Sequence, residues 1–283
     1  MIIALVLLSA LLHATWNALL RLERDKDRAV VAAIIIASLF ASLIAGVRCG
    51  LGAVAFATLR GLAFTIAAGL FEGIYFATLA RAMSLGKLGL VYTISRGGAV
   101  LVVWPMSMAL FAEIATPSAM TGSLIVLGGL TLCGLGAGRV GSGSNPRAAM
   151  LWAMSCAATI AGYHLSYKAA LHEVVNPSAS FALSLGVSAI INVIRLGTPG
   201  RRALRTVIRT RAPRLILMGL ACGGSFLILM EALAIGGSGY VLTLRNTSVL
   251  FAAALSWRIG ERPSRLELIG AALVAAGAVL MAW

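Results

Sequence analysis

Acidic residues are scarce in this sequence of 283 residues, and charged residues of either sign are few. Charged residues make up 11% of the chain and hydrophobic residues 60%, whereas soluble domains carry about 25% charged residues. This composition excludes an ordinary soluble enzyme. It also excludes a disordered chain, which needs low hydrophobicity and high charge. The only aspartates are Asp25 and Asp27, so the aspartate-rich chemistry of prenyltransferases is excluded as well.

Motifs for cofactors are missing too. The sequence contains no G-x-x-x-x-G-K-[ST] loop to hold the phosphates of ATP, so we expect energy to come from a gradient. Its four cysteines are scattered without a C-x-x-C pair or metal-ligand spacing, and we interpret them as small packing residues. We therefore expect no cofactor, no metal and no enzymatic activity.

The basic residues lie mostly in short gaps between long apolar runs. The formal net charge is +14, from 23 Lys and Arg against 9 Asp and Glu. In a soluble protein this balance suggests nucleic acid as a partner, but basic residues between apolar runs are typical of an integral membrane protein. A lipid bilayer is therefore the expected partner, and nucleic acid is not.

Ten apolar runs approach the length of roughly 20 residues that a spanning helix needs. The predicted fold class is an all-α integral membrane protein with ten transmembrane helices. The predicted spans are 2–20, 29–47, 61–80, 89–112, 118–138, 149–171, 178–194, 215–235, 239–257 and 266–282.

The two halves of the sequence are similar when one is shifted by about 150 residues. His13 then lies on His164 and Arg96 on Arg245, so residue types that are rare in membrane helices coincide. Because each half holds five spans, an odd number, the second half must enter the membrane from the opposite side. We therefore predict two inverted-topology five-helix repeats, 1–138 and 149–283, joined by a short linker, 139–148.

The distribution of basic residues predicts the orientation. Eighteen basic residues follow the odd-numbered runs and only two follow the even-numbered ones. Since positive loops stay in the cytoplasm, both termini are expected to face outward. The stretch 195–214, with seven arginines, is expected to be a loop on the anionic inner leaflet.

Several local motifs resemble the drug/metabolite transporter superfamily, in its EamA-type branch. They are His13 to Asn17 (HATWN), Tyr75 followed by Leu79-Ala80, 91–97 (VYTISRG), 244–251 (LRNTSVLF), Gly260-Glu261-Arg262 and, less fully, Ala112-Glu113. The resemblance covers essentially the whole chain. It implies a transporter of amino acids or other small metabolites, and we expect a monomer or homodimer in the bacterial cytoplasmic (inner) membrane. Many relatives are drawn with cytoplasmic termini, whereas the loop charges here indicate the reverse.

Glu72 is the deepest acidic residue in the predicted spans. It lies about eleven residues into the third span, near 16 Å along the helix and close to the bilayer midplane. Charged groups at this depth are costly and usually functional, and desolvation disfavours the ionised carboxylate, as proton coupling requires. Two roles stay open: coupling or cargo contact, and a structural partnership with a polar group of a neighbouring helix.

Arg96 and Arg245 each lie about seven residues into helices that enter from opposite faces of the membrane. Paired guanidinium groups suit carboxylates or phosphates, which they bind by bidentate hydrogen bonds. The alternative is that each arginine snorkels to its own interface or braces a broken helix end. The cationic character of the candidate site favours a carboxylate-bearing cargo, such as an amino acid or organic acid.

Polar residues also mark the first helix of each half. His164 and Lys168 are four residues apart and share a helix face, and His13 and Asn17 occupy the equivalent positions. With Tyr75 of the family-like motif, these residues predict a central pathway for the small-molecule substrate. Hydrogen bonds between the helices are the alternative explanation, and a position at the outer interface is the alternative for Lys168.

Two other functional classes compete with transport. The sequence 236–239 (GGSG) matches the G-x-S-G of rhomboid-type intramembrane proteases, but no histidine follows Ser238 to serve as its base. A non-transporting scaffold or receptor would need helices without a polar interior, which Glu72, His13 and His164 argue against. We therefore predict a secondary transporter that works by alternating access around a midplane site.

Overall fold

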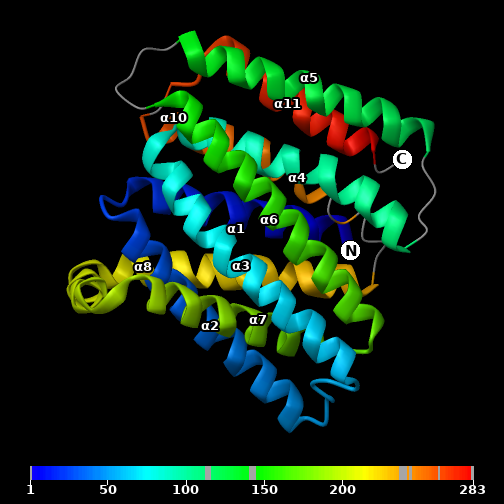
Figure 1. The fold of residues 1–283 in the computed structure, drawn as a ribbon, viewed down its shortest axis with the longest axis vertical. Helices are drawn as coiled ribbons and strands as arrows, with labels where there is room; N and C mark the ends of the chain where they lie inside the picture. The colour runs from blue at the N-terminus through cyan, green and yellow to red at the C-terminus, as the bar shows by residue number, and fades with distance from the viewer. Residues whose placement is uncertain are drawn as a thin grey trace.

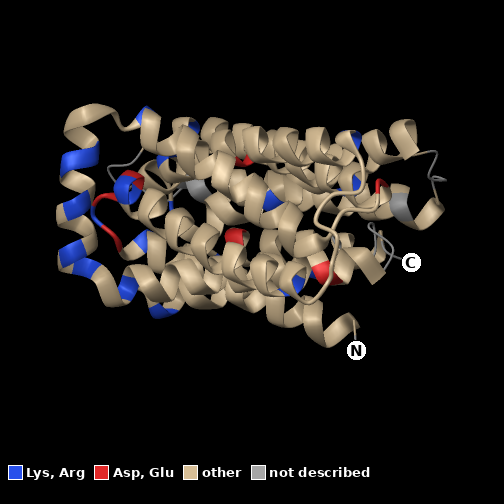
Figure 2. Ribbon diagram, turned by 90° about the horizontal axis from the view of Figure 1, so that it is seen from below, with Lys and Arg blue, Asp and Glu red and all other residues tan. Residues whose placement is uncertain are grey.

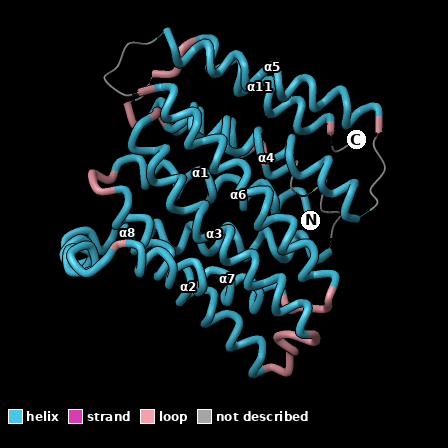
Figure 3. Tube along the Cα trace, viewed as in Figure 1, coloured by secondary structure: helices cyan, strands magenta, loops and turns pink. Residues whose placement is uncertain are grey.

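The computed structural model describes residues 2–111, 116–139, 145–235, 241, 244–260 and 262–281. These residues form ten named helices and no strand (Figure 3). The helices, labelled as in Figure 1, are α1 (Ile2–Leu22), α2 (Lys26–Gly50), α3 (Leu59–Leu85), α4 (Leu88–Phe111), α5 (Pro117–Arg139), α6 (Pro146–His172), α7 (Pro177–Arg195), α8 (Gly197–Ile235), α10 (Ser248–Arg258) and α11 (Arg265–Leu280). Each predicted span overlaps one of them.

Seven helices are long and apolar enough to cross a membrane: α1 to α4 and α6 to α8. The described parts of α10 and α11 are shorter than 18 residues, and α5 carries a shorter apolar segment, Met120–Gly136. The prediction of an all-helical membrane protein is therefore confirmed at the level of the class.

The helices lie side by side, and charge divides the two ends of the bundle. The chain ends marked N and C lie at one end, and most Lys and Arg residues gather at the opposite end (Figure 2). We call this opposite end the basic end. Two acids at the start of α2 form ion pairs: Asp25 with Arg28, and Asp27 with Arg195 at 2.5 Å.

The stretch 195–214 is helical, so the prediction of a loop there is wrong. Residues 197–214 form the first part of α8, which continues through Pro213 into the span, and this basic segment runs across the bundle at the basic end (Figure 2). Leu204 is buried, and Val207 and Ile208 pack against the core. These residues recur at helical spacing opposite the exposed arginines, a short pattern that a search for 20-residue apolar runs does not detect.

Glycines allow α5 and α11 to approach each other closely. A Cβ atom on Gly122 would lie 2.6 Å from the carbonyl oxygen of Gly277, and one on Gly129 would lie 2.7 Å from that of Gly270. Gly122 and Gly129 are seven residues apart, as are Gly270 and Gly277, so each pair forms a stripe along its helix. Small residues at such stripes let helix backbones meet in a membrane.

Gly129→Val is therefore expected to destabilise the protein by about 1–3 kcal/mol, because the new side chain overlaps backbone atoms of α11 that have no room to move. Gly128→Val is the matched control, since a Cβ atom there has no atom within 4 Å. Thermal unfolding in detergent measures both. A Gly129→Val melting temperature equal to that of Gly128→Val would contradict the close α5–α11 packing.

Candidate functional site

His13 of α1 stands at the centre of a buried polar group. It lies on the buried face of α1 with Ser9, Trp16 and Asn17, at the three- and four-residue spacing of one helix face. Its imidazole Nδ1 lies 3.3 Å from the hydroxyl of Ser225 on α8 and 3.3 Å from the indole nitrogen of Trp16. The side chain is completely buried, so every polar contact it makes is within the protein.

Arg96 and Arg245 approach this imidazole from its two nitrogen atoms. Arg96 of α4 contacts Nε2, and Nη2 of Arg245 lies 3.0 Å from Nδ1. The exposed fractions of the two arginines are 4% and 3%, which is incompatible with snorkelling to the interfaces. We call His13, Arg96 and Arg245 the arginine–histidine cluster.

The arginine–histidine cluster has more hydrogen-bond donors than acceptors. Trp16 and Arg245 are donors only, so Nδ1 of His13 must accept. In a neutral imidazole the proton then sits on Nε2, which faces Arg96, another group that is only a donor. Among the described residues, no ion pair involves Arg96 or Arg245, and two atoms of Arg245, Nε and Nη1, have no hydrogen-bond partner. The cluster therefore combines two cations with no anion.

Aromatic rings enclose the arginine–histidine cluster. The ring centroids of Trp16, Tyr92 and Phe226 lie 5.5, 5.9 and 5.4 Å from that of His13. The guanidinium carbon of Arg245 lies 4.6 Å from the centroid of Phe226, within the range of a cation–π interaction. These rings give the cluster apolar surroundings, in which electrostatic interactions are stronger than in water.

Glu72 forms a second buried polar site, on α3. Its carboxylate accepts a hydrogen bond of 3.1 Å from Ser184 of α7, and the Ser184 hydroxyl is also hydrogen-bonded to Tyr167 of α6. The other carboxylate oxygen of Glu72 has no partner among the described residues. Buried polar groups are normally hydrogen-bonded, so this oxygen of Glu72 is an exception in the described part of the chain.

The remaining predicted residues divide between these sites and the periphery. Asn17 donates to the carbonyl of His13 at 2.8 Å. Tyr75 and His164 both contact the ring of Tyr163, with centroid distances of 5.5 and 4.5 Å. Lys168 lies away from them: it donates to Ser107 at 3.2 Å and sits over Phe111 at the end of α4.

Sequence reasoning missed Ser225, Phe226 and Ser184. One available signal was the repeat, because a shift of 150 residues places Phe226 on Phe76. Serine and aromatic residues are common in membrane helices, so their types alone gave no indication. Three residues that the sequence singled out, Glu113, Ser238 and Glu261, lie outside the described residues.

Comparison with known proteins supplies the family. Residues 147–283 match the model of the EamA-like transporter family. This C-terminal part of the chain is therefore similar to the EamA-like transporters. The resemblance seen in the sequence motifs is thus confirmed for residues 147–283, and the matching family is part of the drug/metabolite transporter superfamily.

A solved structure is similar over the whole chain. One crystal structure aligns over 99% of this chain and 95% of its own, with a TM-score of 0.66 and 17% sequence identity. At this identity the likeness shows that the fold is shared. No match is found among the curated proteins.

The family match and the seven long apolar helices indicate an integral membrane protein, and the matching family is one of transporters of small solutes. The family is one of transporters and not of enzymes, in agreement with the expectation from the sequence. The family match implies a lipid environment and a small-molecule substrate.

Proposed function

We propose that this EamA-like transporter carries carboxylate-bearing small solutes, such as amino acids or organic acids, and that the cargo carboxylate binds at the arginine–histidine cluster. The observation that carries the proposal is the convergence of Arg96 and Arg245 on one imidazole, with no acidic partner in the described part of the chain. A carboxylate offers two oxygens that accept bidentate hydrogen bonds from guanidinium groups. An anionic cargo therefore supplies the acceptors and the charge that the cluster lacks.

The surroundings of the cluster suit the rest of such a cargo. Tyr92 and Tyr163 are buried, and their hydroxyl groups have no hydrogen-bond partner among the described residues. Binding sites for small molecules are commonly apolar and aromatic, with a few converging polar groups. We infer that these two tyrosines and Phe226 contact the part of the cargo beyond its carboxylate.

We further propose alternating access between two inverted five-helix halves, 1–138 and 149–283, with energy from an ion gradient. Helix contacts support this symmetry: α3 packs on α6 as α8 packs on α1, and α3 on α7 as α8 on α2. The arginine–histidine cluster draws residues from both halves, as expected for a site at the interface of repeats. Glu72, buried with one free oxygen, is the proposed proton-coupling group.

The basic end is proposed to face the cytoplasm and the anionic leaflet of a bacterial inner membrane, as the positive-inside rule predicts. Cys49 provides a test because it is exposed near the end of α2, whereas the other three cysteines are buried. We expect a membrane-impermeant maleimide added to intact cells to label Cys49, with Cys49→Ser as the unlabelled control. Labelling in inverted vesicles alone would reverse the orientation.

Counterflow in proteoliposomes tests the proposed function without a choice of coupling ion. Vesicles are preloaded with unlabelled amino acids and organic acids and diluted into labelled tracers of the same classes. We expect transient, saturable accumulation of a carboxylate tracer that other carboxylates inhibit and organic cations do not. Exchange of organic cations alone, or no exchange by protein shown to be folded, overturns the proposal.

A further inference from the structure

A row of polar side chains on α7 faces α3 across a tightly packed seam. A Cβ atom on Gly69 of α3 would lie 2.6 Å from the carbonyl oxygen of Ser184, so the two backbones are in close contact. The polar residues recur every four positions and are completely buried. They are Ser180, Ser184, Ser188 and Asn192.

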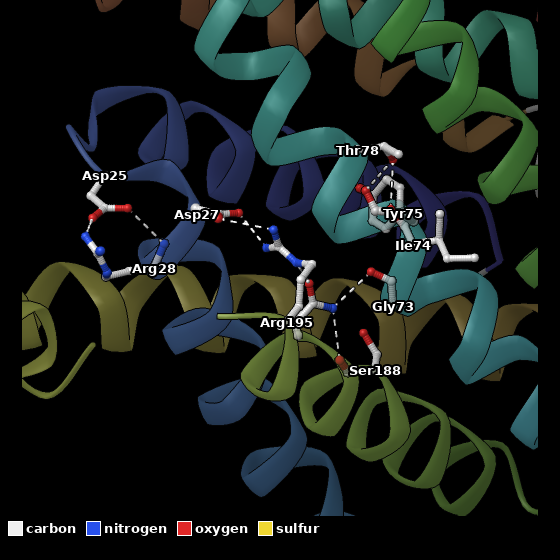
Figure 4. A network of polar contacts seen from close by, with 10 residues as sticks. Asp25, Asp27, Arg28, Gly73, Ile74, Tyr75, Thr78, Ser188 and Arg195 are labelled. Atoms are coloured by element: carbon white, nitrogen blue, oxygen red, sulfur yellow. Dashed lines mark hydrogen bonds and ion pairs between the residues drawn. The ribbon is translucent and has the colours of Figure 1, made fainter. Parts of the chain in front are cut away.

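Asn192 uses both ends of its amide across this seam. Its nitrogen donates to the carbonyl oxygen of Gly73 on α3 at 2.9 Å, and to that of Ser188 at 3.0 Å. Its oxygen accepts from Nε of Arg195 at 3.3 Å. Arg195 in turn binds both carboxylate oxygens of Asp27, at 2.5 and 3.2 Å (Figure 4). A continuous chain of hydrogen bonds thus runs from the start of α2 to the backbone of α3.

This series of hydrogen bonds ends beside Glu72, the proposed coupling residue. Gly73 directly follows Glu72, whose carboxylate accepts from Ser184 on the same face of α7. Ser184 and Asn192 are eight residues apart, about 12 Å along a rigid helix. A shift of α7 against α3 at Glu72 therefore also moves Asn192 and the ion pair at its end.

The charged and titratable groups differ between the two ends of this series of hydrogen bonds. Those near Glu72 come from three other parts of the fold and are Tyr163 and Tyr167 of α6, Cys222 of α8, and Arg245. At the other end, Asp27 faces Arg195, and Arg28 of the same helix is held by Asp25. Asn192 is thus the link between a buried carboxylate and a half-exposed ion pair that joins α2 of the first half to α7 of the second.

We propose that Asn192 is a positioning residue that couples Glu72 to the Asp27–Arg195 ion pair, so that this contact between the halves at the basic end opens and closes with the state of Glu72. The proposal rests on the proposed function, in which Glu72 is the coupling group. Asn192 itself has no place in the cargo site. The amide nitrogen and the amide oxygen of Asn192 transmit the displacement of α7 against α3. If either hydrogen bond breaks, the other loses the support of the buried network.

The transport test compares Asn192→Ala with Ser188→Ala in proteoliposomes. Ser188 lies one turn away on the same buried face, and its hydroxyl has no partner among the described residues, so Ser188→Ala is the matched control. We expect Asn192→Ala to lower accumulation driven by a proton gradient about tenfold or more, while counterflow stays within about twofold of wild type, because exchange needs no coupling. An equal loss of both activities, or of neither, overturns the proposal.

A second test does not depend on transport. Hydrogen–deuterium exchange of the full-length protein follows the amides of residues 23–28, with α5 and α11 as the internal control for folding. Glu72→Gln is expected to change exchange of these amides about threefold or more in the wild-type background and to have no effect in Asn192→Ala. The same response in both backgrounds overturns the proposal. Absence of carboxylate exchange in wild-type vesicles would instead overturn the proposed function, and the amide measurement would still decide the role of Asn192.

Discussion

Arg245→Gln is expected to weaken binding of a carboxylate cargo by about 10- to 100-fold, because a hydrogen bond to a charged group contributes about 1.5–3 kcal/mol. The same variant is expected to unfold at a higher temperature than wild type when no cargo is present. The reason is that Arg96 and Arg245 are two buried cations without an acidic partner in the described residues, and burying an unpaired charge costs several kcal/mol. Loss of binding and gain of stability thus come from one change.

Tracer counterflow and thermal unfolding in detergent measure these two effects. Arg258→Gln serves as the control, since Arg258 is exposed at the end of α10. Arg245→Lys keeps the charge but loses the planar fork, so its binding is expected to fall between that of wild type and that of Arg245→Gln. Unchanged counterflow in Arg245→Gln would remove this arginine from the cargo site.

Glu72→Gln is expected to abolish accumulation of cargo against a gradient while counterflow continues. Glutamine has nearly the shape of glutamic acid and still accepts from Ser184, whose hydroxyl lies 3.1 Å from Glu72, but it carries no exchangeable charge. A transporter without its proton carrier equilibrates cargo and is unable to concentrate it. Wild-type accumulation is expected to follow an imposed proton gradient, and the variant is expected to ignore it.

Uptake into proteoliposomes with an acidic exterior measures this effect, with Glu173→Gln as the control. Glu173 follows α6 at the bundle end and accepts from Thr58 at 3.1 Å, so it offers a carboxylate of the same type outside the buried seam. Proton-driven accumulation by Glu72→Gln at the wild-type level would exclude Glu72 as the coupling group. Loss of counterflow as well would indicate cargo contact, the other role that the sequence left open.

Much of the candidate site was predictable because charge in a membrane is costly. Few polar residues survive within apolar runs, so Glu72, Arg96, Arg245 and His13 stood out in the sequence, and all four are buried in the structure. The repeat indicated that the two arginines are equivalent. Lys168 shows the limit of this reasoning. Helical spacing placed it on the same face as His164, but the sequence gave no information that α4 packs over that end of α6.

The basic segment of α8 shows a second limit. Its arginines made residues 197–214 look like a loop, although Leu204 and its apolar neighbours lie at helical spacing. Hydropathy averaged over about 20 residues responds to net polarity, and a short amphipathic helix loses its signal in that average.

The sequence alone indicated a helical membrane protein, the position of most spans, and the burial of Glu72, Arg96 and Arg245. Composition and the cost of dehydrating charge suffice for these conclusions. Only the tertiary structure decided that Arg96 and Arg245 meet on the two nitrogens of one imidazole, and that Asn192 joins Asp27 to the backbone beside Glu72. Such contacts depend on the rotation and tilt of helices distant in sequence. Those are set by close packing between glycine stripes and side chains on separate helices, and no local pattern encodes them.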